Sequence, residues 1–235
     1  MIKKSIGVGA GTEFIIQSVG AVTDRPIRKN KNVEMSKSKF IIQSVGAGTD
    51  RPFRDSKDDN YYMNLALKEA RKALLNDDVP IGCVIVYNKN IKNKKMFELM
   101  SSHFDFNNID NNQLILSKAY NKRNKDKDAI SHAEILAIKK ACNKIKDYRL
   151  EDCTMYVNLE PCQMCAGAIL QSRIKRLVVG CKSEKSGSCG SIINILDNDK
   201  FNHKVELVFG IKEQESIKLL KDYFKGLRER KNIER

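Results

Sequence analysis

The chain has 235 residues, of which 41% are hydrophobic, and it carries a formal net charge of +14. A chain of this length can bury one complete core but is marginal for two, and it has no stretch of about 18 apolar residues that could cross a membrane. The N-terminal stretch is rich in glycine and interrupted by Glu13, unlike a secretion signal. We therefore expect one cytoplasmic domain with added segments and no membrane association.

The positive charge is spread along the whole chain, with 43 Lys and Arg against 29 Asp and Glu. Such an excess favours a polyanionic partner such as nucleic acid, although a lysine-rich soluble surface explains it about as well. The seven cysteines are odd in number and unevenly spaced, which argues against a disulfide framework. Reduced thiols or a metal site are expected instead.

Residues 1–60 contain a two-copy repeat, FIIQSVGAVTDRPIR starting at Phe14 and its near copy FIIQSVGAGTDRPFR. Two copies are fewer than the roughly three that a solenoid needs, and the segment between them is charged, so we expect a poorly ordered extension. A docking or RNA-binding arm is the functional alternative. In a third interpretation this segment is translated upstream sequence, and the working protein begins at Met35 or Met63 instead of Met1.

Residues 61–235 form the predicted folded domain. Its first element is a helix over 61–76, where apolar residues recur at helical spacing. A buried strand over 79–87, bounded by proline and glycine, follows. A polar insertion rich in asparagine and lysine occupies about 91–113, and an apolar, strand-like run resumes over 114–120.

The second half of the chain alternates helices with strands. Ser131 is predicted as the N-cap of a helix over 131–145, which puts His132 and Glu134 in its first turn. Pro161 fits the first position of the next helix. Further strands are predicted over 154–159 and 176–180, and residues 205–210 are either a fifth short strand or a strand-like connection. A basic helix is predicted over 212–231. Strands alternating with helices predict an α/β layered sheet.

The residues HAE at 132–134 and PCQMC at 161–165 carry the predicted metal chemistry. One imidazole from His132 and two thiolates from Cys162 and Cys165 suit Zn²⁺. Three protein ligands leave the fourth tetrahedral position open for water, which is typical of a catalytic site. Both cysteines begin a helix, where the partial positive charge favours thiolates.

Glu134 lies two residues from His132 and need not bind the metal. Zinc lowers the pKa of a bound water to about 7, and the Glu134 carboxylate is placed to take its proton and to deliver protons to the reacting ring. Burial beside apolar residues would raise the pKa of this glutamate toward neutrality. The spacing matches the H-x-E and P-C-x-x-C signature of zinc-dependent nucleobase deaminases.

Three other interpretations of these residues are open. Cys162 and Cys165 alone would suit a redox pair in a reducing compartment. A closed structural zinc site needs a fourth ligand, for which Cys153 and Cys189 are the candidates, although neither lies in a paired motif. A third interpretation makes His132 an ordinary core histidine beside buried cysteines. It leaves the neighbouring Glu134 unexplained, since buried charges are avoided. Each accounts for fewer of the residues than a catalytic zinc site does.

From about Tyr61 to Lys231 the chain resembles the bacterial tRNA-specific adenosine deaminases, which convert the wobble adenosine of an anticodon to inosine. The resemblance is carried by DDVPIGCVIV, AYNKRN, SHAEILAI, YRLEDCTMYVNLEPCQMCAGAILQSRIKRLVVG, SGSCGS and FNHKVEL. It implies a three-layer α/β/α cytidine-deaminase-like fold with a central mixed sheet of about five strands. It also implies a homodimer, with one Zn²⁺ per subunit, that binds the tRNA anticodon loop.

The resemblance further implies substrate contacts outside the metal site. Asn121 resembles a base-contacting asparagine, although a turn residue that ends a strand accounts for it equally well by spacing. It implies that Ile81 and Ala133 line the base pocket and that Asn202 and His203 contact the RNA backbone. It also implies stacking or phosphate contacts on the last helix, made by Tyr223, Phe224 and Arg228. The last three also fit an ordinary amphipathic helix.

Three features depart from the pattern of this family. The 91–113 insertion is longer than the usual short hairpin, and the repeat in 1–60 has no counterpart. Ser183 stands where many members have an acidic residue near the substrate. The insertion and the repeat are expected to be additions to an intact core, whereas Ser183 affects the expected fine RNA contacts and leaves the chemistry unchanged.

The favoured hypothesis is hydrolytic deamination of adenosine to inosine at the wobble position of tRNA, in which an unstacked anticodon base enters the zinc pocket. The alternative is deamination of a free base or nucleotide such as guanine or cytosine, against which the basic last helix argues. A third hypothesis is a zinc-stabilised RNA-binding protein without catalysis. A Glu134→Gln variant separates the third hypothesis from the first, because only catalysis requires the carboxylate.

Overall fold

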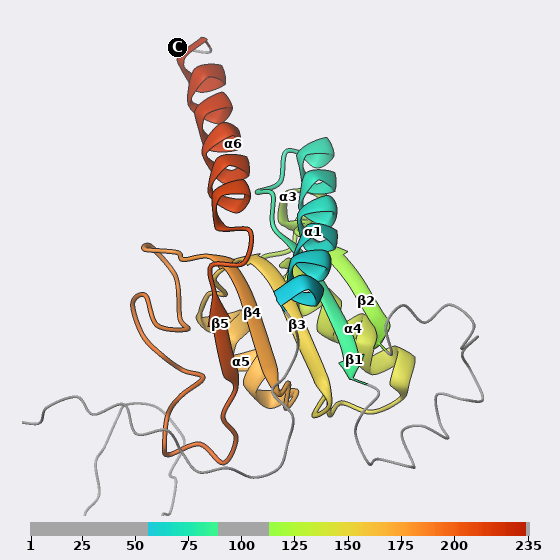
Figure 1. Ribbon diagram of the computed structural model, residues 1–235. Coiled ribbons are helices and arrows are strands. Elements are labelled where there is room, and N and C mark those ends of the chain that lie inside the picture. The colour runs from blue at the N-terminus through green and yellow to red at the C-terminus, as the bar shows by residue number, and fades with distance from the viewer. Residues whose placement is uncertain (1–55, 89–112, 234–235) are drawn as a thin grey trace, which may run out of the picture. The chain divides into compact units, whose positions relative to one another are not determined.

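The structure is a computed structural model that describes residues 56–88 and 113–233. Five strands of this part form one sheet in the order β2-β1-β3-β4-β5 (Figure 1). They are β1 (Gly82–Asn88), β2 (Gln113–Tyr120), β3 (Cys153–Leu159), β4 (Arg176–Cys181) and β5 (Glu206–Phe209). β1 pairs antiparallel with β2 and β3, whereas β3, β4 and β5 are parallel. The predicted mixed sheet of about five strands is confirmed.

Helices cover both faces of the sheet (Figure 1). α1 (Ser56–Ala73) contacts β1 and β3 on one face, and α6 (Glu213–Ile233) contacts β3 and β4. On the opposite face, α4 (Ala133–Ile145) contacts β1 and β2 and also α5 (Gln163–Gln171). The short elements η1 (Leu74–Asn76) and α3 (Arg123–Asp126) lie in the connections on either side of the β1–β2 hairpin. The three-layer α/β/α arrangement is confirmed.

Alternation of side chains along the strands lets one sheet serve two cores. In β1, Cys83 and Ile85 belong to the cluster that includes α4 and α5, whereas Val84 and Val86 belong to the cluster that includes α1. Successive side chains of a strand point to opposite faces, so a strand covered on both faces is apolar on both. All of β1 is buried, which explains why its sequence shows a nearly continuous apolar run.

The first helix starts earlier than its apolar pattern predicts. The pattern begins at Tyr61, but α1 begins at Ser56 and carries Asp58 and Asp59 in its first turn, where carboxylates interact favourably with the helix dipole. Leu74, within the predicted helix over 61–76, is 39% exposed, because the chain tightens there into the 3-10 helix η1. Apolar periodicity therefore locates the core face of this helix and misses its polar first turn.

Asp59 ties the start of α1 to the sheet. Its carboxylate accepts two hydrogen bonds from the Arg176 guanidinium, at 2.8 and 2.9 Å, and one from the Tyr156 hydroxyl at 2.9 Å. Both members of the ion pair are buried. Removing one member of a buried pair is costly because the other is left charged and unpaired in the interior.

An Asp59→Ala variant is therefore expected to lose about 3–5 kcal/mol of unfolding free energy. Urea denaturation followed by circular dichroism measures the loss. The matched control is Asp222→Ala, which removes a carboxylate from an exposed pair with Lys218 and is expected to change the stability little. Equal effects of the two substitutions would contradict the stabilising role of the buried pair.

Most of two predicted segments lies outside the described residues, namely the 1–60 extension up to residue 55 and the 91–113 insertion up to residue 112. Every helix in the described ranges is too short or too polar to span a bilayer. All seven cysteines lie in the described part, and each is a free thiol.

Candidate metal centre

The three predicted metal ligands come together beyond the C-terminal end of β3. His132 is the N-cap of α4, Cys162 is the N-cap of α5, and Cys165 lies in the first turn of α5. The Nδ1 atom of His132 lies 3.7 Å from the Cys162 sulfur and 3.6 Å from the Cys165 sulfur. All three donor atoms lie within 4.8 Å of one another, so the group can hold a metal ion.

Helix α4 begins later than predicted. The predicted cap, Ser131, instead donates its hydroxyl to the carboxylates of Asp126 (3.2 Å) and Asp128 (3.0 Å), and His132 occupies the cap position. The prediction that Ser131 caps this helix and that His132 lies in its first turn is therefore wrong. Two acidic side chains in the preceding loop compete for the hydroxyl, and sequence spacing within the helix does not reveal them.

Helix α5 also begins later than predicted. Pro161 lies before the Cys162 cap and not at the first helical position. Its carbonyl accepts the backbone N–H of Ser188 at 2.9 Å, which binds Pro161 to the loop after β4. Cys162 is consequently at the boundary between strand-like and helical backbone, where its side chain can face His132 on the neighbouring helix.

The two thiols of the group differ in acidity. A hydrogen bond from the Cys165 thiol lowers the pKa of Cys162 to about 4, whereas that bond and burial raise the pKa of Cys165. The hydrogen bond with Cys162 raises the pKa of His132 in turn. Metals bind the thiolate form, and a lowered pKa of Cys162 favours that form.

Glu134, at the start of α4, has a carboxyl group that is not fully satisfied. The residue is 3% exposed, and among the described residues its Oε2 atom has no hydrogen-bond partner. Burial raises the pKa of this carboxyl. Because buried polar atoms are normally paired, an unpaired carboxylate oxygen beside a metal-ligand group is available to a substrate or a water.

Asn121 is the second described residue with such an atom. It is 3% exposed, and its Oδ1 atom has no partner within the described part of the chain. Its backbone N–H bonds the Ile81 carbonyl at 2.9 Å, and the next N–H, of Lys122, bonds the Ser131 carbonyl at 3.0 Å. These two bonds hold the end of β2 beside the residue that precedes His132, so Asn121 lies near the metal-ligand group.

The remaining predicted pocket residues, Ile81 and Ala133, lie in this region. Ile81 is partly buried against the core cluster in which Ala133 is fully buried. The side chain of Asn158, on β3, fixes the segment around Ile81, accepting the Gly82 N–H at 2.8 Å and donating to the Pro80 carbonyl at 3.0 Å. Gly82 has no room for a side chain, since a Cβ would lie 2.1 Å from the Ala66 carbonyl oxygen.

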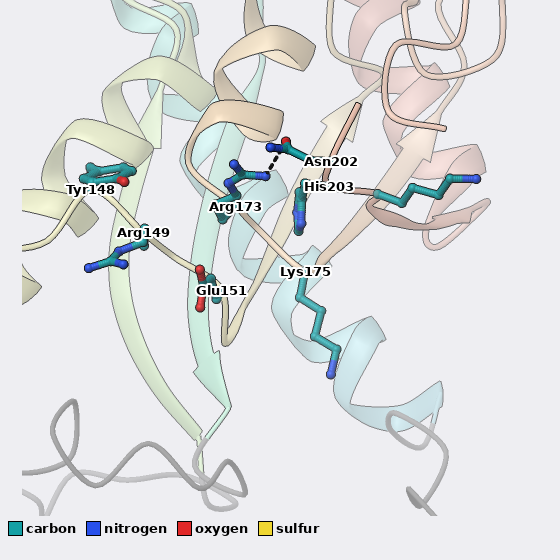
Figure 2. A pocket seen from close by; sticks show the side chains of 8 residues that line it. Tyr148, Arg149, Glu151, Arg173, Lys175, Asn202 and His203 are labelled. Atoms are coloured by element: carbon teal, nitrogen blue, oxygen red, sulfur yellow. Dashed lines mark hydrogen bonds between the residues drawn. The ribbon is translucent and has the colours of Figure 1, made fainter. Parts of the chain in front are cut away.

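Asn202 and His203 lie elsewhere. They line a pocket of about 670 Å³ that also includes Arg173 and Lys175 (Figure 2). Arg173 and Lys175 come just before β4, and Asn202 and His203 come just before β5, whereas Cys162 and Cys165 come just after β3. Because β3, β4 and β5 are parallel, the pocket and the metal ligands lie at opposite ends of the sheet. A seven-residue strand is about 20 Å long, so the structure does not bring Asn202 and His203 to the metal centre of their own chain.

Four cationic side chains line the pocket in Figure 2. Three of them have polar or acidic partners, namely Asp147 for Arg149, Asn202 for Arg173, and Asp197 and Asp199 for Lys204. Glu151 adds a negative charge to the lining. His203 itself bonds the Ile174 carbonyl at 2.9 Å, which fixes the loop before β5.

On α6 the predicted contact residues differ in exposure. Tyr223 donates its hydroxyl to the Asp77 carbonyl at 3.0 Å, so it also attaches the helix to the turn before β1. Phe224 is 40% exposed and packs edge-on against Tyr223. Arg228 is exposed one turn further along. Phe224 and Arg228 are thus the members of this set that a partner can reach most easily.

Glu160, which was not among the predicted site residues, organises the loop after β4. Its buried carboxylate accepts the backbone N–H groups of Ser183 (3.0 Å), Cys189 (3.0 Å) and Ser191 (3.1 Å), and also the Ser191 hydroxyl. Ser183, where an acidic residue is common, is held through its backbone. The only signal in the sequence is a glutamate directly before the Pro–Cys pair, and its partners lie more than twenty residues away.

Comparison with known proteins gives consistent matches over the described domain. The family model of the MafB19-like deaminases matches residues 57–228. The tRNA-specific adenosine deaminase of Bacillus subtilis (strain 168) is 37% identical over 177 residues, which is 75% of this chain and 95% of that protein. The tRNA-specific adenosine deaminase of Aquifex aeolicus (strain VF5) is 36% identical over 168 residues, which is 72% of this chain and 95% of that protein.

Solved structures show the same fold. One from a study of A-to-I editing by tRNA:A34 deaminases at the wobble position aligns with a TM-score of 0.55 and 31% identity, covering 68% of this chain and 99% of that one. A guanine deaminase from Nitrosomonas europaea aligns with a TM-score of 0.51 and 19% identity, covering 70% of this chain and 83% of that one. At that identity the second match supports the fold alone.

Proposed function

This chain belongs to the family of the MafB19-like and tRNA-specific adenosine deaminases, and from that membership we propose how its residues convert adenosine to inosine. The reaction is hydrolytic deamination at the wobble position of tRNA. One observation carries the proposal. The group of His132, Cys162 and Cys165 lies beside Glu134, a buried glutamate whose Oε2 atom has no hydrogen-bond partner among the described residues.

We propose that the group binds one Zn²⁺ per chain. Zinc bonds of about 2.3 Å to sulfur and about 2.0–2.1 Å to nitrogen give a nitrogen–sulfur separation of about 3.6 Å in a tetrahedral site. The separations of 3.7 and 3.6 Å between the His132 nitrogen and the two sulfurs support this assignment. The donor set of one imidazole and two thiolates also suits zinc, and its three ligands leave one position open.

When bound, zinc supplies a Lewis acid that makes a water nucleophilic near neutral pH. Glu134 accepts a proton from the attacking water and delivers it to the N1 atom of adenine. It then moves the second proton of that water to the amino group, which leaves as ammonia, so the carboxylate is restored. Burial raises the pKa of Glu134, and a higher proton affinity helps the side chain to hold each proton between transfers.

We propose that the adenine is held by Asn121, Ile81 and Ala133. A base in an anticodon loop is already unstacked, so it can be splayed into a pocket at small cost. The unpaired Oδ1 of Asn121 supports the assignment, because a bound nucleoside would supply the missing partner. The bond between the Asn121 N–H and the Ile81 carbonyl keeps these two residues together on one side of the pocket.

The RNA outside the pocket is proposed to contact α6, with Phe224 and Tyr223 stacking on bases and Arg228 on a phosphate. An Arg228→Gln variant is then expected to raise KM for tRNA several-fold without changing kcat. It is also expected to reduce the slope of log affinity against log salt by about 1. Filter binding at several salt concentrations measures the slope, and Lys68→Gln, on the exposed side of α1, is the matched control. An unchanged slope would remove Arg228 from the RNA interface.

We also propose that the chain forms a homodimer in the cytoplasm, where tRNA is used. Asn202 and His203 lie about 20 Å from the metal centre of their own chain. They can contact the RNA backbone only if the RNA extends along the sheet or is bound at the partner subunit. Light scattering of the free protein measures the oligomeric state. A monomer would exclude contact with RNA that is bound at a partner subunit.

The decisive experiment incubates the purified protein with a tRNA that carries a wobble adenosine and, in parallel, with free guanine, cytosine and adenosine. Inosine is expected in the tRNA, detected by sequencing or nuclease digestion, with no turnover of the free compounds. Turnover of a free compound with unchanged tRNA would contradict tRNA deamination and support deamination of a free base or nucleotide instead. Tight tRNA binding without any turnover would favour a non-catalytic RNA-binding protein.

A further inference from the structure

Asp78 is a buried carboxylate that the proposed chemistry does not use. It lies in the turn between η1 and β1 and is 1% exposed. Its Oδ1 atom accepts the backbone N–H of Asn124 at 2.6 Å, and its Oδ2 atom accepts the N–H of Lys125 at 3.1 Å. Two backbone bonds to the single turn of α3 hold both oxygens of this side chain in place.

The third partner of Asp78 is the base-pocket asparagine. The Nδ2 group of Asn121 donates to Asp78 Oδ1 at 3.4 Å. A carboxylate accepts hydrogen bonds and cannot donate them, so it selects the NH₂ side of the amide. The reverse orientation would place the Asn121 carbonyl oxygen against the carboxylate, which is repulsive. The amide therefore has one favourable orientation, in which Oδ1 points away from Asp78.

That orientation accounts for the unpaired Asn121 Oδ1 atom. The backbone N–H of Asn121 is fixed on the Ile81 carbonyl, and its NH₂ group is fixed on Asp78, so Oδ1 cannot turn to another partner without breaking a bond. An unsatisfied buried acceptor costs stability in the free protein. The cost is recovered when a ligand supplies an N–H or O–H donor.

We propose that Asp78 is a positioning residue for the deamination reaction. By orienting the Asn121 amide, it makes this residue an acceptor for an N–H or O–H donor of the bound nucleoside. The proposal rests on the proposed function of the site, in that Asn121 contacts the substrate. Asp78 acts through Asn121 and does not touch the substrate.

A double-mutant cycle tests the proposal, with kcat and KM measured on a tRNA that carries a wobble adenosine. Asp78→Ala is expected to lower kcat/KM about tenfold in the native background, as the loss of one oriented hydrogen bond would. In an Asn121→Ala background the same substitution is expected to change kcat/KM less than about threefold, because the amide it orients is absent. Equal losses in the two backgrounds would overturn the proposal and assign Asp78 a purely structural role.

Two controls separate positioning from loosening of the fold. Asp77→Asn changes the neighbouring carboxylate, which pairs with Arg230 on α6 and has no bond to the Asn121 side chain, so it is expected to leave kcat/KM unchanged. An asparagine also tolerates the left-handed backbone of that residue, at φ 53°. If Asp78→Ala does not fold, Asp78→Asn, which keeps the side-chain volume, enters the same cycle.

A readout independent of turnover distinguishes this inference from the proposed function. The side-chain NH₂ resonances of Asn121 are identified in an NMR spectrum of the full chain by their absence from the Asn121→Ala variant. In Asp78→Ala their hydrogen exchange is expected to become faster, because the carboxylate no longer accepts them. Unchanged exchange would overturn the orienting contact even if the native chain edits tRNA. Faster exchange in a protein that leaves tRNA unedited would support the contact and reject only the proposed function.

Discussion

A Glu134→Gln variant is expected to deaminate a wobble adenosine about 10²–10⁴ times more slowly than the native chain. Glutamine has nearly the same shape as glutamate but cannot take up and release a proton at neutral pH. The buried position of Glu134 means that no solvent-exposed group replaces it easily. Single-turnover kinetics with excess enzyme measure the chemical step directly, so slow product release cannot hide the loss.

The same variant is expected to bind tRNA and zinc as the native chain does, because Glu134 is not a ligand in the proposed site. The matched control is Glu151→Gln, which removes a carboxylate from the pocket at the other end of the sheet (Figure 2). Native activity is expected for the control. A Glu134→Gln enzyme that retains most of its rate would show that another group moves the protons.

Replacing Cys162 or Cys165 by serine is expected to abolish both zinc binding and activity. A serine hydroxyl stays protonated near neutral pH and is a poor ligand, so the site keeps only two of its three donors. Metal analysis of protein purified with zinc is expected to fall from about one ion per chain to a small fraction of that. The deamination rate is expected to fall below about one thousandth of the native rate, because the water is no longer activated.

Cys142→Ser provides the matched control for this pair. Cys142 is a half-buried free thiol on α4, and its sulfur contacts the Tyr148 carbonyl at 3.6 Å, away from the ligand group. Its substitution is expected to leave zinc content and activity unchanged. Full zinc occupancy in Cys162→Ser or Cys165→Ser would require a different ligand set.

The metal site could be predicted from the sequence because its members lie close together in short local motifs. Cys162 and Cys165 are three residues apart at the start of a helix, so one turn brings them to the same side. His132 and Glu134 begin another helix. The types of these four side chains limit the chemistry, although contacts of Ser131 and Pro161 with neighbouring segments decide where each helix begins.

The layered fold could also be predicted, since burial produces periodic patterns in the sequence. Fully covered strands such as β1 are apolar along their length, and α1 shows an apolar face at helical spacing. The apolar pattern does not predict polar residues that are buried because they form hydrogen bonds. The polar first turn of α1 is part of the fold because Asp59 reaches Arg176, 117 residues away.

The sequence by itself therefore determined the layered sheet and singled out the residues proposed as metal ligands and proton carrier, since residue type and short-range spacing are sufficient for these. Only the tertiary structure decided that Asp78 orients Asn121, 43 residues away, that Glu160 holds the loop after β4, and that Asn202 lies at the far end of the sheet. Each depends on which polar groups the folded chain brings within about 3 Å of one another. A buried polar side chain is stabilised by specific hydrogen-bond donors and acceptors. Because these partners occur at no regular spacing along the chain, the sequence pattern does not reveal them.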